Sequence, residues 1–263
     1  MASLRAGVYD VPMNEARGTT GGEAPRAPTP TRRAAGWAVH ALTASGAFLG
    51  LLSMLAIIRG DAHGALLWLG VALAVDGLDG PMARRLRIRD IIPKVDGAVL
   101  DLVVDYLTYV LVPAIFIYWF ALLPSYWGLD LAGAGFILVT SLYCFANIEM
   151  KTSDNYFVGF PAIWNVVALY MWVLDSPPVA NAIVVAALGV LTFVPVKFVH
   201  PIRVRDNRRI TYGATILWTA CSLGLVLLDR QAPWLLWPWL GASAWLAFTS
   251  LRRTFMGAAD GRD

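Results

Sequence analysis

Long apolar stretches, separated by short polar connections, dominate the chain after its first 38 residues. A helix needs about 20 apolar residues to cross the hydrocarbon core of a bilayer. By this measure the pattern predicts helices at roughly 39–58, 64–83, 97–122, 128–149, 157–175, 179–198, 212–228 and 234–251. The expected fold class is therefore all-α, a polytopic integral membrane bundle of about eight transmembrane helices.

The first part of the chain has a different composition. Residues 1–35 are rich in Gly, Pro, Thr, Ala and Arg and show no apolar periodicity, which is typical of a disordered segment. We expect a disordered cytoplasmic tail over 1–35, a membrane domain over 36–254 and a short C-terminal tail over 255–263. No cleavable signal peptide is expected, because mostly polar residues precede the first apolar stretch.

Composition and charge support this assignment. The chain is 58% hydrophobic and 15% charged, whereas soluble domains are about a quarter charged. With eight crossings, 19 of the 21 Lys and Arg residues lie on one side, and only Arg59 and Arg230 on the other. The positive-inside rule places the basic side in the cytoplasm. These cations serve topology and anionic headgroups, so no nucleic-acid partner is expected.

Four aspartates lie within the second and third predicted helices, where a single unpaired acid costs about 2.5–3.5 kcal/mol on insertion scales. Asp76 and Asp79 are three residues apart and share a helix face. Gly97, Asp101 and Asp105 repeat every four residues and form a second stripe. The basic hairpin between them folds the two stripes together. We expect four carboxylates to converge on Mg²⁺ or Mn²⁺, which prefer oxygen ligands.

The neighbouring residues suit a phosphate substrate. Gly80 and Ala83 leave room for a ligand beside the helix, and the Arg84 guanidinium matches phosphate oxygens. A pair of divalent ions can clamp a phosphate during in-line displacement. Helix capping or pairing with an arginine would explain one acid, but it does not explain the set of four.

The motif Asp76-x2-Asp79-Gly80-x2-Ala83-Arg84 … Gly97-x3-Asp101-x3-Asp105 resembles the signature of the CDP-alcohol phosphotransferases. These membrane enzymes move a phosphatidyl or similar group from a CDP-linked donor to an alcohol. Residues 85–96 make the second spacer four residues longer than the family's usual eight, which is close to one helical turn. This longer spacer resembles the bacterial phosphatidylcholine synthases. So do HALTASGAFLG at 40–50, LDLVVDYLTYVLVPA at 100–114, MKTSDNYFVGFPAIWN at 150–165 and FVHPIRVR at 198–205.

The resemblance implies a reaction and roles for the motif residues. CDP-diacylglycerol and choline would give phosphatidylcholine and CMP in the bacterial inner membrane, with the site on the cytoplasmic face. Asp76, Asp79 and Asp101 would be the principal ligands of Mn²⁺ or Mg²⁺, with two ions expected. Asp105 would be partly coordinated and would accept the proton of the choline hydroxyl. The other motif residues would line the nucleotide and phosphate: Gly80, Ala83, Arg84 and Gly97. A homodimer is one expected assembly, because many relatives are dimers.

The residues that would bind choline have two possible explanations in the sequence. A quaternary ammonium cannot donate hydrogen bonds, so aromatic faces and a carboxylate usually bind it. The candidates near the cytoplasmic side are Tyr106, Tyr109, Tyr143, Glu149, Asp154, Tyr156 and Phe157. Our hypothesis combines Glu149 or Asp154 with one or two of these rings, and an aromatic belt at the membrane interface is the competing explanation.

Three further groups of polar or small residues are assigned candidate roles. His200, Arg203 and Arg205 either hold the donor phosphate or anchor the sixth predicted helix. His40, at the start of the first predicted helix, is a further candidate near the nucleotide. Gly46 and Gly50 form one GxxxG pattern, which favours close helix packing.

Two other functions remain open. One is a related enzyme that uses serine, inositol or glycerol phosphate as the acceptor. The other is an ion-coupled transporter, because intramembrane acids often mark ion pathways. Transporters usually place such acids near the midplane between repeats, whereas here they adjoin a basic hairpin and no repeat is visible.

Overall fold

The computed structural model describes residues 29–147, 157–194, 197–198 and 208–259 of the chain. Its elements, in chain order, are α1 (Pro30–Ile58), α2 (Ala62–Leu86), α3 (Ile88–Ile91), α4 (Gly97–Asp105), the π-helix η1 (Tyr106–Leu111), α5 (Val112–Trp119), the 3₁₀ helix η2 (Tyr126–Gly128), α6 (Leu129–Ala146), β1 (Phe157–Val158), α7 (Trp164–Leu174), α8 (Pro178–Leu191), β2 (Lys197–Phe198), α9 (Arg208–Leu227) and α10 (Pro233–Ala259). The predicted all-α, polytopic class is confirmed.

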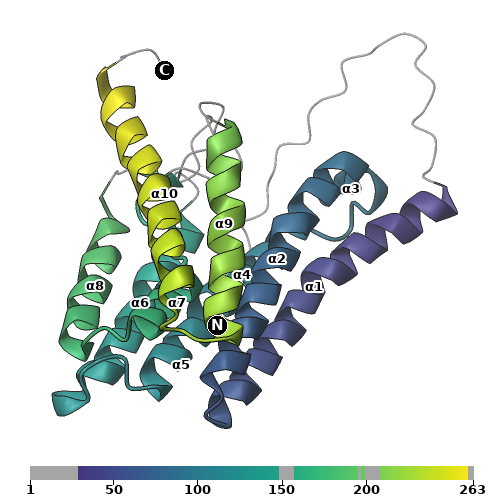
Figure 1. Cartoon of the computed structure of the whole chain (residues 1–263). Coiled ribbons are helices and arrows are strands. Elements are labelled where there is room, and N and C mark those ends of the chain that lie inside the picture. The colour runs from purple at the N-terminus through teal and green to yellow at the C-terminus, as the bar shows by residue number, and fades with distance from the viewer. Residues whose placement is uncertain (1–28, 148–156, 195–196, 199–207, 260–263) are drawn as a thin grey trace, which may run out of the picture.

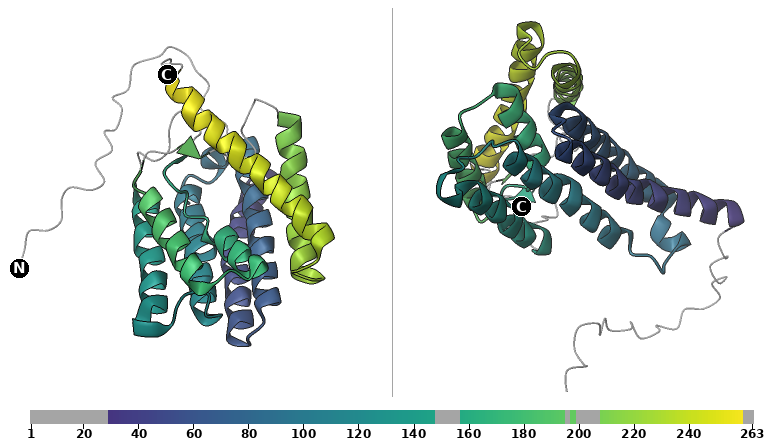
Figure 2. Two further views of the ribbon diagram at one scale, coloured as in Figure 1. Left: turned by 60° about the vertical axis from the view of Figure 1, so that its left-hand side comes forward. Right: turned by 90° about the horizontal axis from the view of Figure 1, so that it is seen from below.

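The helices form a bundle of antiparallel neighbours. Figure 1 shows α1 and α2 side by side on one flank, while α9 and α10 are joined at their lower ends and diverge upward. The continuous span α4–η1–α5 runs beside the α1–α2 pair, as the view from below in Figure 2 shows. The start of α1, the short helix α3, the start of α9 and the end of α10 all lie at one end of the bundle. This is the end that the charge pattern predicts to be basic.

Five helical spans in the described part of the chain are long and apolar enough to cross a membrane: Pro30–Ile58, Ala62–Leu86, Gly97–Trp119, Tyr126–Ala146 and Arg209–Leu227. Many of their large apolar side chains face outward; Phe48, Leu131 and Ile216 are each at least 60% exposed. Such a surface is stable only against lipid, because water would penalise so much exposed apolar area. The protein is therefore a multi-pass membrane protein.

Two predicted helices are shorter than expected. Helix α7 has 11 residues and α8 has 14, so the predictions of full-length helices at 157–175 and 179–198 were wrong in extent. Pro161 disfavours helical geometry at Phe160, whose backbone amide instead donates to the Leu191 carbonyl at 3.1 Å. Strands β1 and β2 pair antiparallel nearby, with Phe157 opposite Phe198.

The first helix also begins earlier than predicted. Residues 30–35, assigned to the disordered tail, form the start of α1, and residues 255–259 of the predicted C-terminal tail continue α10. Thr29 caps α1 by accepting a hydrogen bond from the Arg32 amide at 3.4 Å, and Pro30 occupies the first turn. Both are ordinary signals of a helix start. Residues 1–28 and 260–263 lie outside the described part.

The long spacer between the two halves of the motif folds as part of the bundle. Arg87 has a φ of 52°, which ends α2 and turns the chain into α3. Ile88, Ile91 and Ile92 are buried, and a Cβ on Gly36 of α1 would lie only 2.9 Å from Ile92 Cδ1. The spacer therefore supplies an apolar contact for the extended start of α1.

Candidate metal centre and active site

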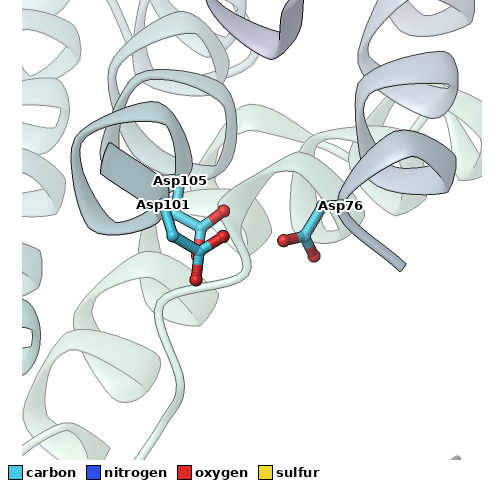
Figure 3. A group of neighbouring side chains, drawn as sticks. All are labelled: Asp76, Asp101 and Asp105. Carbon is cyan, nitrogen blue, oxygen red and sulfur yellow. The ribbon is translucent and has the colours of Figure 1, made fainter. Parts of the chain in front are cut away.

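Three of the four predicted aspartates converge between α2 and α4. Asp76, Asp101 and Asp105 each offer a carboxylate oxygen, and these oxygens lie within 4.8 Å of one another. Figure 3 shows Asp76 reaching from one helix toward the other two. Two full negative charges about 5 Å apart repel by roughly 3 kcal/mol at an effective dielectric constant near 20. Half-buried carboxylates at this spacing fit a divalent cation that prefers oxygen ligands.

Asp79 is not part of this three-carboxylate group, but it lines the same hollow. Its side chain is 3% exposed, and Thr43 of α1 lies beside its carboxyl group. The hollow lies between α1, α2, α4 and η1. Its lining residues are Thr43, Gly46, Ala72, Val75, Asp76, Asp79, Asp101, Val104, Asp105 and Thr108. All four predicted aspartates thus face one space.

A tyrosine that the sequence suggested only as a possible choline ring contacts this site directly. The Tyr109 hydroxyl donates to Asp76 Oδ2 at 2.6 Å, and Tyr109 is 9% exposed. The sequence feature that points to this contact is the position of Tyr109, four residues after Asp105, which continues the Asp101–Asp105 spacing. A tyrosine on an apolar helix is nevertheless common as an interface residue, so the spacing alone did not single it out.

Small residues allow α1 to approach the aspartates. A Cβ on Gly46 would lie 2.5 Å from Val104 Cγ1, and a Cβ on Gly50 would lie 3.2 Å from Leu107 Cδ2. The packing role predicted for these two glycines is confirmed. The helices can come this close only because neither position carries a side chain.

Packing against α1 also explains why position 97 is a glycine. A Cβ at this position would lie 3.0 Å from His40 Cε1 on α1. His40 is 7% exposed, and its Nε2 atom makes no hydrogen bond within the described part of the chain. The motif glycine therefore accommodates the imidazole ring of α1 at the start of α4.

The remaining motif residues lie along the end of α2. The Arg84 guanidinium folds back one turn, so that a Cβ on Gly80 would lie 3.3 Å from Arg84 Nη1. Arg84 is exposed and Ala83 is half-buried. The Arg84 guanidinium therefore lies beside Gly80, in the last turns of α2.

Tyr143, one of the predicted choline residues, does not line the hollow. Tyr143 lies on α6, where its hydroxyl accepts a hydrogen bond from Asn147 Nδ2 at 3.3 Å. Its ring lies 4.7 Å from that of Phe193, and both side chains are exposed. The other predicted substrate residues lie outside the described residues: Glu149, Asp154, His200 and Arg203.

Comparison with known proteins gives a consistent set of relatives. The phosphatidylcholine synthase of Pseudomonas aeruginosa is 49% identical over 228 residues, covering 86% of this chain and 94% of that protein. That of Bradyrhizobium diazoefficiens is 43% identical and covers 84% and 83% of the two chains. That of Mesorhizobium japonicum is 40% identical and covers 79% and 78%. No protein-family model matches the chain.

Proposed function

The chain belongs to the phosphatidylcholine synthase family, and on that basis we propose that it transfers the phosphatidyl group of CDP-diacylglycerol to choline. The products are phosphatidylcholine and CMP. The observation that carries the assignment is 49% identity over nearly the whole of a named relative. The carboxylates of Asp76, Asp101 and Asp105, gathered at positions of the CDP-alcohol phosphotransferase motif, fit the same chemistry.

The acidic residues have a defined task in this reaction. Asp76, Asp101 and Asp105 would hold divalent metal, with Asp79 completing the site for a pair of Mn²⁺ or Mg²⁺ ions. Bound metal neutralises the pyrophosphate charge and makes its phosphorus more electrophilic. The exposed Arg84, beside Gly80, supplies a further positive group for the donor phosphates at the end of α2.

Proton transfer is assigned to Asp105. The oxygen of the choline hydroxyl forms a bond to the phosphorus that carries diacylglycerol, and the bond from this phosphorus to the CMP oxygen breaks. CMP departs with that electron pair. The Asp105 carboxylate takes the hydroxyl proton, as a general base positioned by its helix. Its place in the hollow beside Asp101, where it is half-buried, supports this role.

We also propose residues for the two substrate pockets. The exposed rings of Tyr143 and Phe193, 4.7 Å apart, offer the aromatic faces that a quaternary ammonium requires, with Glu149 or Asp154 as the partner carboxylate. His200 and Arg203 are proposed to hold the donor phosphate. We place the enzyme in the bacterial inner membrane with the site facing the cytoplasm, as the basic end of the bundle suggests. We also propose a homodimer.

The decisive experiment is acceptor choice by the purified protein. Protein in detergent receives CDP-diacylglycerol and choline, serine, inositol or glycerol phosphate, and CMP release is measured. We expect release with choline only. Release with another alcohol alone would reject the choline assignment, and liposome uptake of an ion without CMP release would favour the transporter alternative. The choline KM of Tyr143→Ala and Glu149→Gln tests the pocket, because unchanged values in both would exclude these residues.

A further inference from the structure

The Tyr109 side chain links the two helical spans that carry the three-carboxylate group. Its hydroxyl, on η1, donates to Asp76 Oδ2 on α2 at 2.6 Å. Hydrogen bonds from a hydroxyl to an ionised carboxylate have this length and are stronger than those between neutral groups. The tyrosine is 9% exposed and belongs to the apolar core. Water is therefore a poor substitute for this donor.

A change in helix winding gives Tyr109 its position. Pro113 has no amide hydrogen, so it cannot make the α-helical bond to the Tyr109 carbonyl four residues earlier. The chain instead forms the π-helix η1, and the Val112 amide donates to the Leu107 carbonyl five residues back. A wider π turn is often found at functional sites. The bulge here follows directly after Asp105.

The wider turn changes which side chains share a face. Four residues of an α-helix make one turn plus about 40°, so an unbroken helix would rotate Tyr109 by about 80° from Asp101. A π turn contains more residues, so four of them complete less rotation. The bulge therefore turns Tyr109 back toward the stripe of Asp101 and Asp105, where its hydroxyl meets Asp76.

A carboxylate that binds metal must be held at one rotation about its Cβ–Cγ bond. Asp76 approaches the other two carboxylates alone, from the opposite helix (Figure 3). A hydrogen bond to Oδ2 restricts its rotation before any cation arrives. Groups that orient metal ligands in this way typically change metal affinity or activity by about 10- to 100-fold when they are removed.

We propose that Tyr109 is a positioning residue that orients the Asp76 carboxylate for divalent metal, and that the π-helix η1 places it there. This inference rests on the proposed function, because it assigns Asp76 to the metal site of that reaction. Tyr109 itself touches neither metal nor substrate in this role. Its contribution is a fixed geometry of Asp76.

The test compares two tyrosines on the same π-helix. Tyr109→Phe removes only the hydroxyl that reaches Asp76. Tyr106→Phe is the matched control, because the Tyr106 hydroxyl donates to the Leu138 carbonyl at 3.1 Å rather than to Asp76. For each purified variant, Mn²⁺ binding without substrate is measured by calorimetric titration and by the metal-induced rise in Tm. Choline-dependent CMP release is then followed across Mn²⁺ concentrations.

For Tyr109→Phe we expect the Mn²⁺ Kd to increase by about 10- to 100-fold, with activity recovering at high Mn²⁺. The Tyr106→Phe variant should lose some metal-free Tm and keep the wild-type Kd. An unchanged Kd in Tyr109→Phe would overturn the proposal, provided that Asp76→Ala abolishes binding. So would an equal loss of affinity in both tyrosine variants, which would indicate a merely structural effect.

The two proposals fail in different ways. A wild-type protein that binds Mn²⁺ but releases CMP only with another alcohol would reject the choline assignment and leave the Tyr109 proposal intact. A wild-type protein that releases CMP with choline but binds no Mn²⁺ would reject the Tyr109 proposal and leave the reaction intact.

Discussion

Replacing Gly46 with alanine should separate α1 from the aspartate helix. The new Cβ would lie 2.5 Å from Val104 Cγ1, whereas carbon atoms in comfortable contact are about 3.5–4.0 Å apart. One or both helices must therefore move by about 1 Å. Val104 directly precedes Asp105, and both line the hollow together with Gly46. The displacement will reach the reacting groups.

The size of the effect follows from two terms. Overpacking of this kind typically costs about 1–3 kcal/mol. Alanine also favours the helix over glycine by about 1 kcal/mol, which partly offsets the loss. Gly70→Ala on α2 is the matched control, because a Cβ there would meet no packed neighbour among the described residues within 4 Å. The difference in unfolding free energy between the two variants isolates the packing cost, since both gain the same helix propensity.

Activity should fall more steeply than stability. A misplacement of about 1 Å can reduce a catalysed rate by about 100-fold. We expect Gly46→Ala to lower choline-dependent CMP release 10- to 100-fold on this scale, while Gly70→Ala stays near wild type. Val104→Ala removes the clashing Cγ1, so Gly46→Ala/Val104→Ala should recover much of the loss, with a coupling energy of about 0.5–3 kcal/mol. Equal Tm and kcat in Gly46→Ala and Gly70→Ala would refute the packing explanation.

Four further outcomes are expected. Asp105→Asn should abolish CMP release while the protein remains inserted and keeps its Tm, and normal turnover would remove Asp105 from the mechanism. Exhaustive chelation should stop CMP release, and Mn²⁺ or Mg²⁺ should restore it; full activity in the chelated sample would contradict the metal assignment. Asp175→Asn should lower the unfolding free energy by less than about 1 kcal/mol. The residue pairs with Arg230 at 3.2 Å, but the Asp175 side chain is 68% exposed, and exposed ion pairs contribute little. Arg230→Met should cost more, about 1–3 kcal/mol, since the guanidinium also donates to the Trp172 carbonyl at 3.1 Å; thermal unfolding of both variants checks this order.

Helical periodicity was sufficient to predict where the acids meet. The three- and four-residue spacings of Asp76, Asp79, Asp101 and Asp105 fix one face on each helix, and the structure turns both faces to one hollow. Gly46 and Gly50 were predicted to pack for a similar reason. These predictions succeed because they depend on local geometry within a helix.

Features set by contacts between distant segments could not be predicted. The composition of residues 30–35 resembles that of the tail, yet Ile92 packs on Gly36 and supports a helix there. Apolar content alone also overestimated the lengths of α7 and α8, because it does not show that the adjoining segments β1 and β2 pair with each other. The link from Tyr109 to Asp76 depends on the π turn before Pro113, which no hydrophobic pattern reports.

The 29 residues of α1 have a consequence for how the two substrates meet. At 1.5 Å per residue the helix is about 43 Å long, whereas the hydrocarbon layer is about 30 Å thick, so an upright α1 is longer than this layer. Asp101 and Asp105 lie about 6 and 12 Å along α4 from Gly97, close to the end at which this span begins. With the site at the proposed membrane face, a water-borne alcohol would arrive from the aqueous phase while the lipid donor keeps its acyl chains in the same leaflet. Neither reactant would then have to cross the hydrocarbon core, and the product would be released directly into the leaflet that held the lipid donor.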